Sequence, residues 1–248
     1  MPDRGWCVSL HHVLDIAASI VLLPVLIEQA LYVRRNIAQL PEPQGARRGT
    51  SGSGPNLRIL ILGESSAVGL GADTQAEALL GQIIQALNPQ FTLTYGLVAV
   101  IGARTVDSLG WLFDLPAERY DVVVTAFGVN DVTKGTSLRR FLGLQDRLIA
   151  RLQSERHAKL IVVSGLPPVN EFPALPQPLR WVLGRQAHRF DQALHLLVTP
   201  RKGCAALVFD MALDTSKMSR DGFHPRPVVY AAWAKNVARV VHAHAPFA

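Results

Sequence analysis

Cysteine is scarce in this chain, whose 248 residues include only Cys7 and Cys204, at opposite ends. Two cysteines so far apart in the sequence define no disulfide framework, and they are too few for a cysteine-based zinc site. Cys7 also precedes the apolar stretch near the N-terminus, whereas the cysteine of a lipoprotein signal follows its apolar stretch. The sequence therefore argues against a disulfide-stapled domain and against a lipoprotein signal.

Runs of basic residues are also absent. The chain has 25 Lys and Arg residues against 19 Asp and Glu residues, but the basic residues stand singly or in pairs such as Arg34-Arg35 and Arg139-Arg140. No nucleic-acid-binding module accompanies them, so we expect no nucleic-acid partner. The low hydrophobicity of a disordered chain is missing too, because 49% of the residues are hydrophobic, which is ample for a core.

Nucleotide and metal motifs are missing as well. The segment from Gly63 to Gly71 has neither the Gly-x-Gly-x-x-Gly spacing nor a Gly-Lys-Ser/Thr ending, so phosphate binding is not expected there. A metallophosphoesterase would need an Asp-x-His pair and a histidine beside Asn130, and the sequence has neither. We therefore expect no metal and no other cofactor.

Residues 1–54 differ in kind from the rest of the chain. An apolar zone runs from Val13 to Val33 and is interrupted by Asp15, Glu28 and Gln29. A membrane-spanning helix needs about 20 mostly apolar residues, so this zone is marginal. The alternatives are a helix that spans a membrane, a helix that lies on a membrane surface, and a helix that packs on the rest of the protein.

Four arginines follow the apolar zone: Arg34, Arg35, Arg47 and Arg48. By the positive-inside rule they would leave the main domain in the cytoplasm. A cleaved signal peptide fits less well, because the first residues carry Asp3 and Arg4 together and no small-x-small cleavage site follows the apolar zone. We expect a membrane-associated protein with its main domain on the cytoplasmic side. A soluble cytoplasmic protein is the alternative.

Residues 41–55 contain Gly, Ser, Arg and Pro without periodicity, which indicates a linker. We therefore expect an N-terminal apolar helix and linker at residues 1–54 and a domain at residues 55–248. From Leu57 onward strands alternate with helices and no internal repeat occurs, which predicts an α/β fold, a three-layer α/β/α sandwich around a five-stranded parallel sheet. Strands are expected near residues 57–62, 92–98, 121–127, 159–164 and 206–209, and helices near 75–87, 105–113, 138–156, 179–198 and 227–242.

The first of these strands ends at a pair of serines. From Leu57 to Gly71 an apolar run is followed by a glycine, an acid and Ser65-Ser66, which indicates a buried parallel strand that turns tightly into a helix. Ser65 would then lie at the carboxyl end of a central strand, where open α/β sheets bind ligands and where a helix amino terminus offers N–H groups to a developing negative charge. The alternative role for either serine is a helix N-cap.

A serine nucleophile needs a base, a group that orients the base, and donors for an oxyanion. Asp221 and His224 stand three residues apart just before a helical stretch. A second buried strand, from Asp121 to Phe127, runs directly into Gly128-Val-Asn-Asp131. These two segments are the candidates for the missing groups, with helix capping as the alternative role of Asp221.

Four short motifs in this order resemble those of the SGNH (GDSL) hydrolases, a family of esterases, lipases, thioesterases and carbohydrate deacetylases. The resemblance covers the chain from about Asn56 to the C-terminus. The motifs are Gly63-Glu-Ser65, Gly102, Gly128-x-Asn130 and Asp221-x-x-His224.

The resemblance implies a flavodoxin-like strand order and a role for each motif. Ser65 would be the nucleophile, His224 the base that accepts its proton, and Asp221 the group that orients the imidazole. The oxyanion would be bound by the backbone N–H groups of Ser65 and Gly102 and by the side-chain amide of Asn130.

The sequence departs from the family pattern in two places. Glu64 stands where the family usually has aspartate, which puts the hydrogen bonding of that turn in question. The asparagine that often precedes the family glycine is missing before Gly102. Asp131 follows Asn130 as in the family, with an expected structural role.

A proline-rich segment from Gly165 to Trp181 follows the fourth predicted strand. Its prolines stiffen an extended loop at the edge where Ser65 is expected, so four apolar residues of this loop would line an acyl pocket. They are Phe172, Leu175, Leu179 and Trp181. The alternative is ordinary packing of a long loop.

We expect a serine ester hydrolase that cleaves short- to medium-chain acyl esters through an acyl-enzyme on Ser65. An acyltransferase or a thioesterase would use the same residues, because only the acceptor or the leaving group differs. A third alternative, from another class, is a non-catalytic, membrane-tethered module that binds a small molecule. The expected partners are the acyl ester and a membrane in contact with residues 13–33, and the sequence does not predict an oligomeric state.

Overall fold

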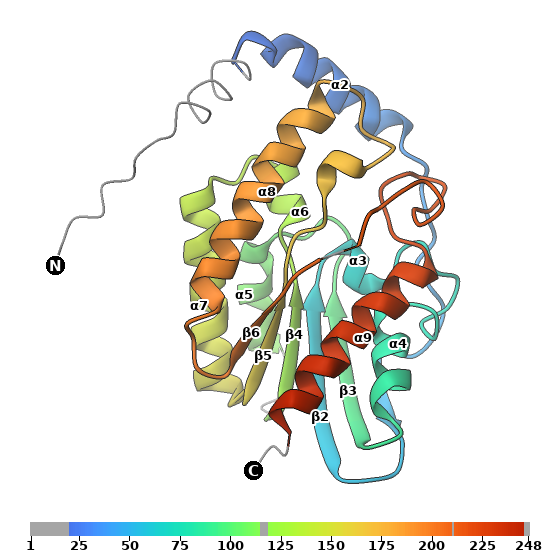
Figure 1. Cartoon of the computed structure of the whole chain (residues 1–248), viewed down its shortest axis with the longest axis vertical. Coiled ribbons are helices and arrows are strands. Elements are labelled where there is room, and N and C mark those ends of the chain that lie inside the picture. The colour runs from blue at the N-terminus through green and yellow to red at the C-terminus, as the bar shows by residue number, and fades with distance from the viewer. Residues whose placement is uncertain (1–19, 115–118, 210, 246–248) are drawn as a thin grey trace, which may run out of the picture.

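The computed structural model describes residues 20–114, 119–209 and 211–245. In these ranges a six-stranded sheet has helices on both faces (Figure 1), which confirms the predicted α/β sandwich. The strand order across the sheet is β1-β3-β2-β4-β5-β6. The strands are β1 (Arg48–Ser51), β2 (Asn56–Gly63), β3 (Thr92–Ala99), β4 (Val122–Ala126), β5 (Leu160–Ser164) and β6 (Cys204–Leu207).

The five predicted strands are β2 to β6, and they are all parallel, with β2 hydrogen-bonded to both β3 and β4. Every residue of β4 and β5 is buried. A parallel strand covered by helices on both faces needs side chains that are apolar on both sides, which explains the unbroken Val and Ile runs in these strands. The carboxyl ends of these parallel strands meet at one edge of the sheet.

The predicted linker is partly wrong, because Arg48–Ser51 forms β1, an antiparallel edge strand. Its register pairs Arg48 with Gly96 and Ser51 with Leu93 of β3. The strand is short and largely exposed, so it has no apolar alternation from which a strand could be predicted. The sheet therefore begins before the predicted domain boundary at residue 55. At the other edge, β6 spans 204–207 instead of the predicted 206–209.

Three predicted helices agree closely with the structure: α5, α7 and α8. The helix α7 has the predicted bounds, because Ser137 caps its first turn by accepting a hydrogen bond from the Arg140 N–H at 3.3 Å. The helix predicted directly after the first strand is α3, whereas α6 was not predicted, because its five residues are too few for a periodic pattern. The helices are α2 (Leu23–Asn36), α3 (Ser65–Val68), α4 (Leu79–Leu87), α5 (Thr105–Asp114), α6 (Val129–Thr133), α7 (Leu138–Arg156), α8 (Leu179–Val198) and α9 (Pro227–His244), with a 3-10 turn at Val169–Glu171.

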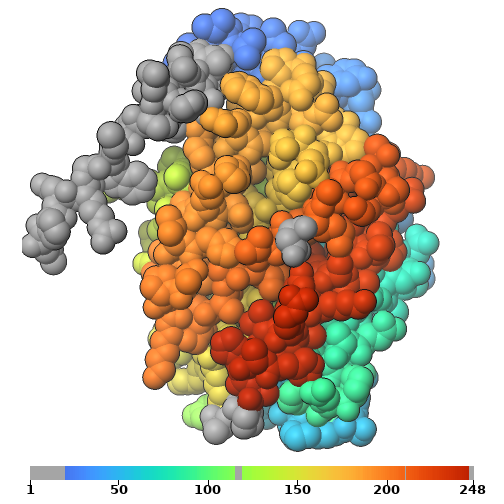
Figure 2. Space-filling model, in the orientation of Figure 1, coloured from blue at the N-terminus to red at the C-terminus, as the bar shows by residue number. Residues whose placement is uncertain are grey.

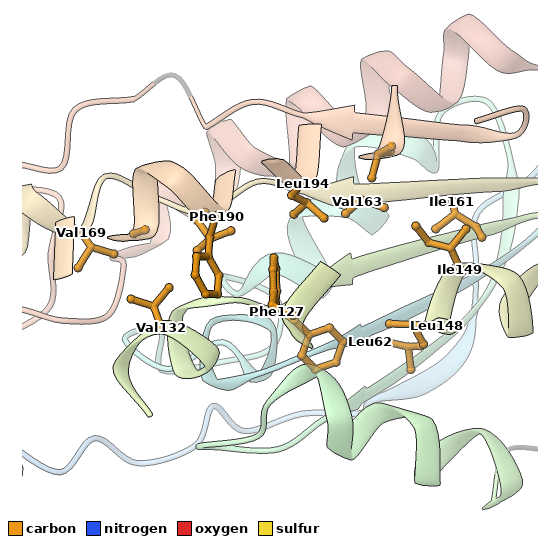
Figure 3. Packing of buried hydrophobic residues seen from close by; sticks show 14 of the residues in the cluster. Leu62, Phe127, Val132, Leu148, Ile149, Ile161, Val163, Val169, Phe190 and Leu194 are labelled. Atoms are coloured by element: carbon orange, nitrogen blue, oxygen red, sulfur yellow. The ribbon is translucent and has the colours of Figure 1, made fainter. Parts of the chain in front are cut away.

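The core consists of two apolar layers, one on each face of the sheet. Helices α5, α7 and α8 cover one face, and α4 and α9 cover the other (Figure 1). In Figure 3, Ile149 of α7 and Leu194 of α8 reach the sheet beside Ile161 and Val163 of β5. Burial of this kind contributes roughly 1.5–3 kcal/mol for each large aliphatic side chain, so these two layers hold the strand ends in place.

Helix α2 lies at one end of the molecule, at the top of Figures 1 and 2, and packs on the start of α8. Leu26 is buried there, and the Gln29 amide donates to the Gln177 carbonyl at 2.6 Å and accepts from the Leu179 N–H at 3.0 Å. Five large apolar side chains of α2 are exposed: Leu23, Val25, Ile27, Leu31 and Tyr32. Ile20 and Val21, just before the helix, are exposed too, and so are the charged Glu28, Arg34 and Arg35.

The predicted apolar zone, residues 13–33, is described only from residue 20 onward. Across the described ranges, no helix combines the length and the apolar character that crossing a membrane requires.

Candidate active site

Ser65 lies where β2 turns into α3, at the carboxyl edge of the sheet. The turn depends on Gly63, because a Cβ at that position would lie 2.4 Å from the Ala67 Cβ and 2.8 Å from the Ala126 carbonyl oxygen. Only glycine therefore lets α3 fold back over the end of β2 while β4 stays paired beside it. The result is a serine hydroxyl at the amino terminus of a short helix.

The structure brings together Ser65, His224 and Asp221, the three residues predicted from the sequence. His224 Nε2 is 2.8 Å from Ser65 Oγ, and His224 Nδ1 is 2.5 Å from Asp221 Oδ2. The second oxygen of Asp221 accepts hydrogen bonds from the backbone N–H groups of Phe223 and His224, both at 3.0 Å. The Asp221 side chain is only 1% exposed, so its orientation is set by these contacts.

The electrostatics of Asp221 favour its charged form. Burial by itself raises the pKa of this carboxyl, but hydrogen bonds from the His224 ring and from the backbone of His224 and Phe223 together hold the pKa below its usual range. The carboxylate therefore accepts the proton of Nδ1, which leaves Nε2 as the acceptor that faces the Ser65 hydroxyl. This arrangement can remove the proton of Ser65 and return it to a leaving group.

The turn that carries Asp221 and His224 is closed by the backbone. The Ser219 N–H donates to the His224 carbonyl at 2.8 Å, and Met218 pairs with Pro225 in an isolated bridge. The Tyr230 hydroxyl of α9 donates to the Leu70 carbonyl at 2.7 Å, which ties the following helix to the end of α3. The base and the nucleophile are therefore held together although 159 residues separate them in the chain.

Asn130 lies on α6, which begins directly after β4. The chain enters α6 through Gly128, whose φ of 139° is accessible mainly to glycine. A side chain there would also collide with Leu166, since a Cβ would lie 2.8 Å from its Cγ. This turn brings the Asn130 side chain to the same cavity as Ser65 and His224.

Glu64, the departure from the usual aspartate, joins the two turns. Its two carboxylate oxygens accept hydrogen bonds from the backbone N–H groups of Val129 and Asn130, both at 3.0 Å. Burial raises the pKa of Glu64 to about 8; the two N–H groups oppose this shift and the neighbouring Asp131 adds to it. The longer side chain therefore keeps the turn intact, and it fixes the start of α6 beside Ser65.

Asp131 has the structural position that was expected of it. It is fully buried, and its Oδ2 accepts from the Thr105 N–H at 2.9 Å and from the Thr105 hydroxyl at 2.8 Å. Gln145 of α7 donates to the same hydroxyl at 3.1 Å. These contacts join α6 to the start of α5. No sequence signal pointed to Thr105 or Gln145, because their roles depend on packing between helices that are far apart in the chain.

Gly102 lies in the turn after β3, and its carbonyl accepts a hydrogen bond from Lys134 Nζ at 2.5 Å. The Val100 N–H donates to the Gly63 carbonyl at 3.3 Å, so this turn runs close to the end of β2. Gly102 is not among the residues that line the cavity with Ser65 and Asn130. Its role as an oxyanion donor stays a prediction.

A cavity of about 640 Å³, counted out to the open solvent, begins at these polar groups. We call it the Ser65 cavity. Most of its lining is apolar and comes from the segments that follow β4, β5 and β6 and from α9. The apolar lining includes Phe127, Val129, Leu166, Pro167, Phe172, Phe209, Leu213, Met218, Phe223 and Trp233.

Of the four residues predicted to line an acyl pocket, one lies in the Ser65 cavity, and its contact with an acyl chain stays a prediction. Phe172 lines the Ser65 cavity, whereas Leu175 and Leu179 are buried in the core and Trp181 is 39% exposed; none of these three lines it. The physical reason is that the chain turns from the loop into α8 at Leu179, which directs the two leucines inward. The other lining residues were missed because they come from separate loops, although their position just after strand ends is a usable signal.

No group of three or more His, Cys, Asp or Glu side chains that could hold a metal ion occurs in the part of the chain that the structure describes.

The family model of the GDSL-like Lipase/Acylhydrolase family matches residues 61–232, a range that contains Ser65, Asn130, Asp221 and His224. The protein belongs to this family, as the sequence motifs indicated, and it is a hydrolase of the esterase and lipase class. No curated protein is similar enough in sequence to count as a match.

Solved structures of similar fold include three that cover most of this chain. The lipase Lip_vut3 from a goat rumen metagenome has a TM-score of 0.61 at 16% identity, covering 77% of this chain and 100% of its own. A carbohydrate esterase family 2 enzyme from Corynascus thermopiles has a TM-score of 0.60 at 14% identity, covering 78% and 68%. A lipase/acylhydrolase from Enterococcus faecalis has a TM-score of 0.52 at 18% identity, covering 75% and 96%. At these identities the likeness concerns the fold.

Proposed function

We propose that this hydrolase cleaves short- to medium-chain acyl esters through an acyl-enzyme on Ser65. The observation that carries the proposal is the continuous set of hydrogen bonds from Ser65 Oγ through the His224 ring to Asp221, at the mouth of an apolar cavity. Ser65, Asn130 and His224 all line that cavity, and most of its other lining residues are apolar. An ester fits this site when its carbonyl lies beside Ser65 and its hydrocarbon chain enters the apolar cavity.

In the first half-reaction, Ser65 Oγ attacks the ester carbonyl while its proton passes to His224 Nε2. The tetrahedral intermediate then collapses, and His224 returns this proton to the departing alcohol. In the second half-reaction, a water gives a proton to His224 and attacks the acyl carbon, and the carboxylic acid leaves as Ser65 is reprotonated. Asp221 stabilises the imidazolium that forms in both halves.

The negative charge on the carbonyl oxygen needs donors that are already in position. The backbone N–H of Ser65, at the start of α3, and the side-chain amide of Asn130 are the two donors beside the cavity, with the Gly102 N–H as a third. Losing one such donor typically lowers kcat by about 10²- to 10³-fold. The contact of Glu64 with the backbone of Asn130 supports its place in this set, because it fixes the backbone from which that amide extends.

A chromogenic series of p-nitrophenyl esters, from acetyl to myristoyl, tests the proposal directly. We expect turnover that is highest for short or medium acyl chains, together with labelling of Ser65 by a fluorophosphonate, located by mass spectrometry. Ligand binding without turnover or labelling would favour the non-catalytic module instead. Acyl transfer is distinguished from hydrolysis by adding an alcohol acceptor and measuring the ratio of new ester to free acid. Thioesterase activity is measured by replacing the ester with the acyl-CoA.

We also propose that α2 lies on the cytoplasmic surface of a membrane. Its outward side chains form an apolar stripe with Arg34 and Arg35 at the C-terminal end, a pattern suited to hydrocarbon and anionic headgroups at once. The helix contacts Gln177 and Leu179, in the segment that follows β5, so it lies at the same end of the molecule as the Ser65 cavity. A lipid-soluble ester would then reach the cavity from the membrane side.

Vesicle sedimentation tests this location. The full chain is expected to sediment with vesicles containing phosphatidylglycerol, and Ile27→Glu with Leu31→Glu should lower the bound fraction by at least about fivefold. Leu196→Glu with Phe113→Glu is the matched control, since it places the same two charges on exposed apolar residues of α8 and α5. A bound protein that resists alkaline carbonate spans the membrane instead, and one that stays free of vesicles has no membrane location.

A further inference from the structure

A second cavity lies against the Ser65 cavity. It holds about 320 Å³ counted out to the open solvent, and four of its lining residues, Ser164, Gly165, Phe209 and Trp233, also line the Ser65 cavity. The remaining lining is mainly aliphatic: Leu207, Val208, Met211, Val229, Ala232 and Asn236. The four shared residues form a wall between the two cavities. Most of the bulk of this wall is the rings of Phe209 and Trp233.

The two rings of the wall are held in different ways. Trp233 is buried in α9, and its Nε1–H donates to the Ser164 hydroxyl at 3.1 Å, so the indole is fixed to the end of β5. Phe209 follows β6 and meets Trp233 edge to face, with ring centroids 6.5 Å apart and an interplanar angle of 77°. The phenyl ring has no polar anchor and is only partly buried. A substitution of Phe209 can therefore open the wall without breaking the hydrogen bond that holds Trp233.

The second cavity is suited to hydrocarbon. Seven of its ten lining residues have large or small apolar side chains, and Ser164 has its hydroxyl engaged with Trp233. A hydrocarbon chain that passed the wall would exchange water for aliphatic contacts. An acyl chain that stops at the wall makes no use of this space.

We infer that Phe209, packed on Trp233, sets the upper limit of acyl chain length by closing the Ser65 cavity against the second cavity. The inference rests on the proposed function, and it names the residue that determines specificity within it. Each methylene buried in the Ser65 cavity should raise kcat/KM by about fourfold, until the chain reaches the two rings. Beyond that length kcat/KM should fall.

The experiment measures kcat/KM for p-nitrophenyl esters of two to fourteen carbons in four variants. In Phe209→Ala, the acyl chain with the highest kcat/KM should be at least two carbons longer. The kcat/KM of that longer ester, divided by the kcat/KM of the acetyl ester, should rise by about tenfold or more. Phe209→Leu, a milder change, should move it in the same direction. Ala232→Leu added to Phe209→Ala refills the second cavity and should return the maximum to its original length.

Phe172→Ala is the matched control, because Phe172 lines the Ser65 cavity and has no part in the second one. Its substitution removes the same side chain from the Ser65 cavity but does not join the two cavities, so the maximum should shift by less than in Phe209→Ala. An unchanged maximum in Phe209→Ala and Phe209→Leu, or an equal shift in Phe172→Ala, would overturn the inference.

The same variants are examined without turnover by measuring how far free fatty acids of each length raise the melting temperature. The longest acid that stabilises the wild-type protein should be shorter than the longest that stabilises Phe209→Ala. If no ester were hydrolysed but this limit still moved with Phe209, the proposed function would be wrong and the inference on the wall would stand. If esters were hydrolysed and the length limit were the same in both proteins, the proposed function would stand and the inference on the wall would be wrong.

Discussion

The site at Ser65 and the helix α2 are opposites in how they treat polar and apolar groups. At the site, Glu64 and Asp221 are buried, and each is hydrogen-bonded to backbone N–H groups at 3.0 Å. On α2, large apolar side chains are exposed, up to 63% for Tyr32, and two hydrogen bonds of Gln29 hold the helix to the domain. A buried acid without hydrogen-bond partners is costly, and so is an apolar surface exposed to water. The molecule supplies partners for its buried acids, but it leaves the apolar side chains of α2 exposed.

The two regions differ in how strongly they depend on contacts with the rest of the fold. Glu64 is held by α6, which lies 65 residues further along the chain, and Ser65 is held by His224, which lies 159 residues away, so removing one group affects the others. Helix α2 is attached at one end of α8 and contributes one side chain, Leu26, to the buried core.

Ser65→Ala should lower kcat by about 10⁴- to 10⁶-fold, because it removes the only hydroxyl that His224 Nε2 contacts in the structure described. Ser66→Ala is the neighbouring control and should keep a substantial part of the activity. Steady-state hydrolysis of a p-nitrophenyl ester measures both. Equal losses in the two variants would show that the nucleophile has been assigned to the wrong serine.

Asp221→Asn should lower kcat by about 10⁴-fold while changing KM little, because an amide in place of the carboxylate no longer holds the proton on Nδ1. The backbone N–H groups of Phe223 and His224 can still donate to the amide oxygen, so the turn should stay folded. The measurement is kcat and KM with a thermal unfolding curve. A change confined to KM would contradict the orienting role.

Asn130→Ala should lower kcat by about 10²- to 10³-fold, the usual effect of losing one oxyanion donor. Val129→Ala is a control at the adjacent position of α6, since the backbone N–H that Glu64 accepts is unchanged in both variants. Pre-steady-state acylation with a p-nitrophenyl ester isolates the affected step. Acylation at the wild-type rate would remove Asn130 from the oxyanion site.

Glu64→Gln should change how stability depends on pH. The folded-state pKa of about 8 lies above the ordinary value of 4.5, so the contribution of Glu64 is fully present below pH 4.5 and is lost as pH rises through 8. Between pH 5 and 9 the wild-type protein should lose on the order of 4 kcal/mol more than the variant. Urea unfolding at several pH values measures this, and parallel curves for the two proteins would refute the raised pKa.

Deletion of α2 should have the smallest effect on catalysis. A chain that starts at Gln39 keeps β1 and is expected to hydrolyse acetyl esters within about twofold of the full chain, because the site needs nothing from α2. A chain that starts at Gly54 also loses β1 and its pairing with β3, so it should be less stable to urea. If the Gln39 chain aggregated, α2 would be covering an apolar face that the domain needs.

The sequence by itself determined the elements that have long, regular patterns and the residues that have motif spacing. The apolar run at 57–62 forms β2, the predicted α7 matches at both ends, and the motif spacing predicts Ser65, His224 and Asp221, which the fold brings together. Periodicity and strand-end position are local properties, so they can be read without knowing what packs against them.

The tertiary structure alone decided what depends on distant partners. It made β1 from an exposed segment by offering the free edge of β3, and it used the extra methylene of Glu64 to reach the backbone of Asn130. It also built the cavity wall from Phe209 and Trp233, which no spacing in the sequence connects. In each case the side chain or strand is satisfied by a group from another part of the chain, and only folding brings the two within contact.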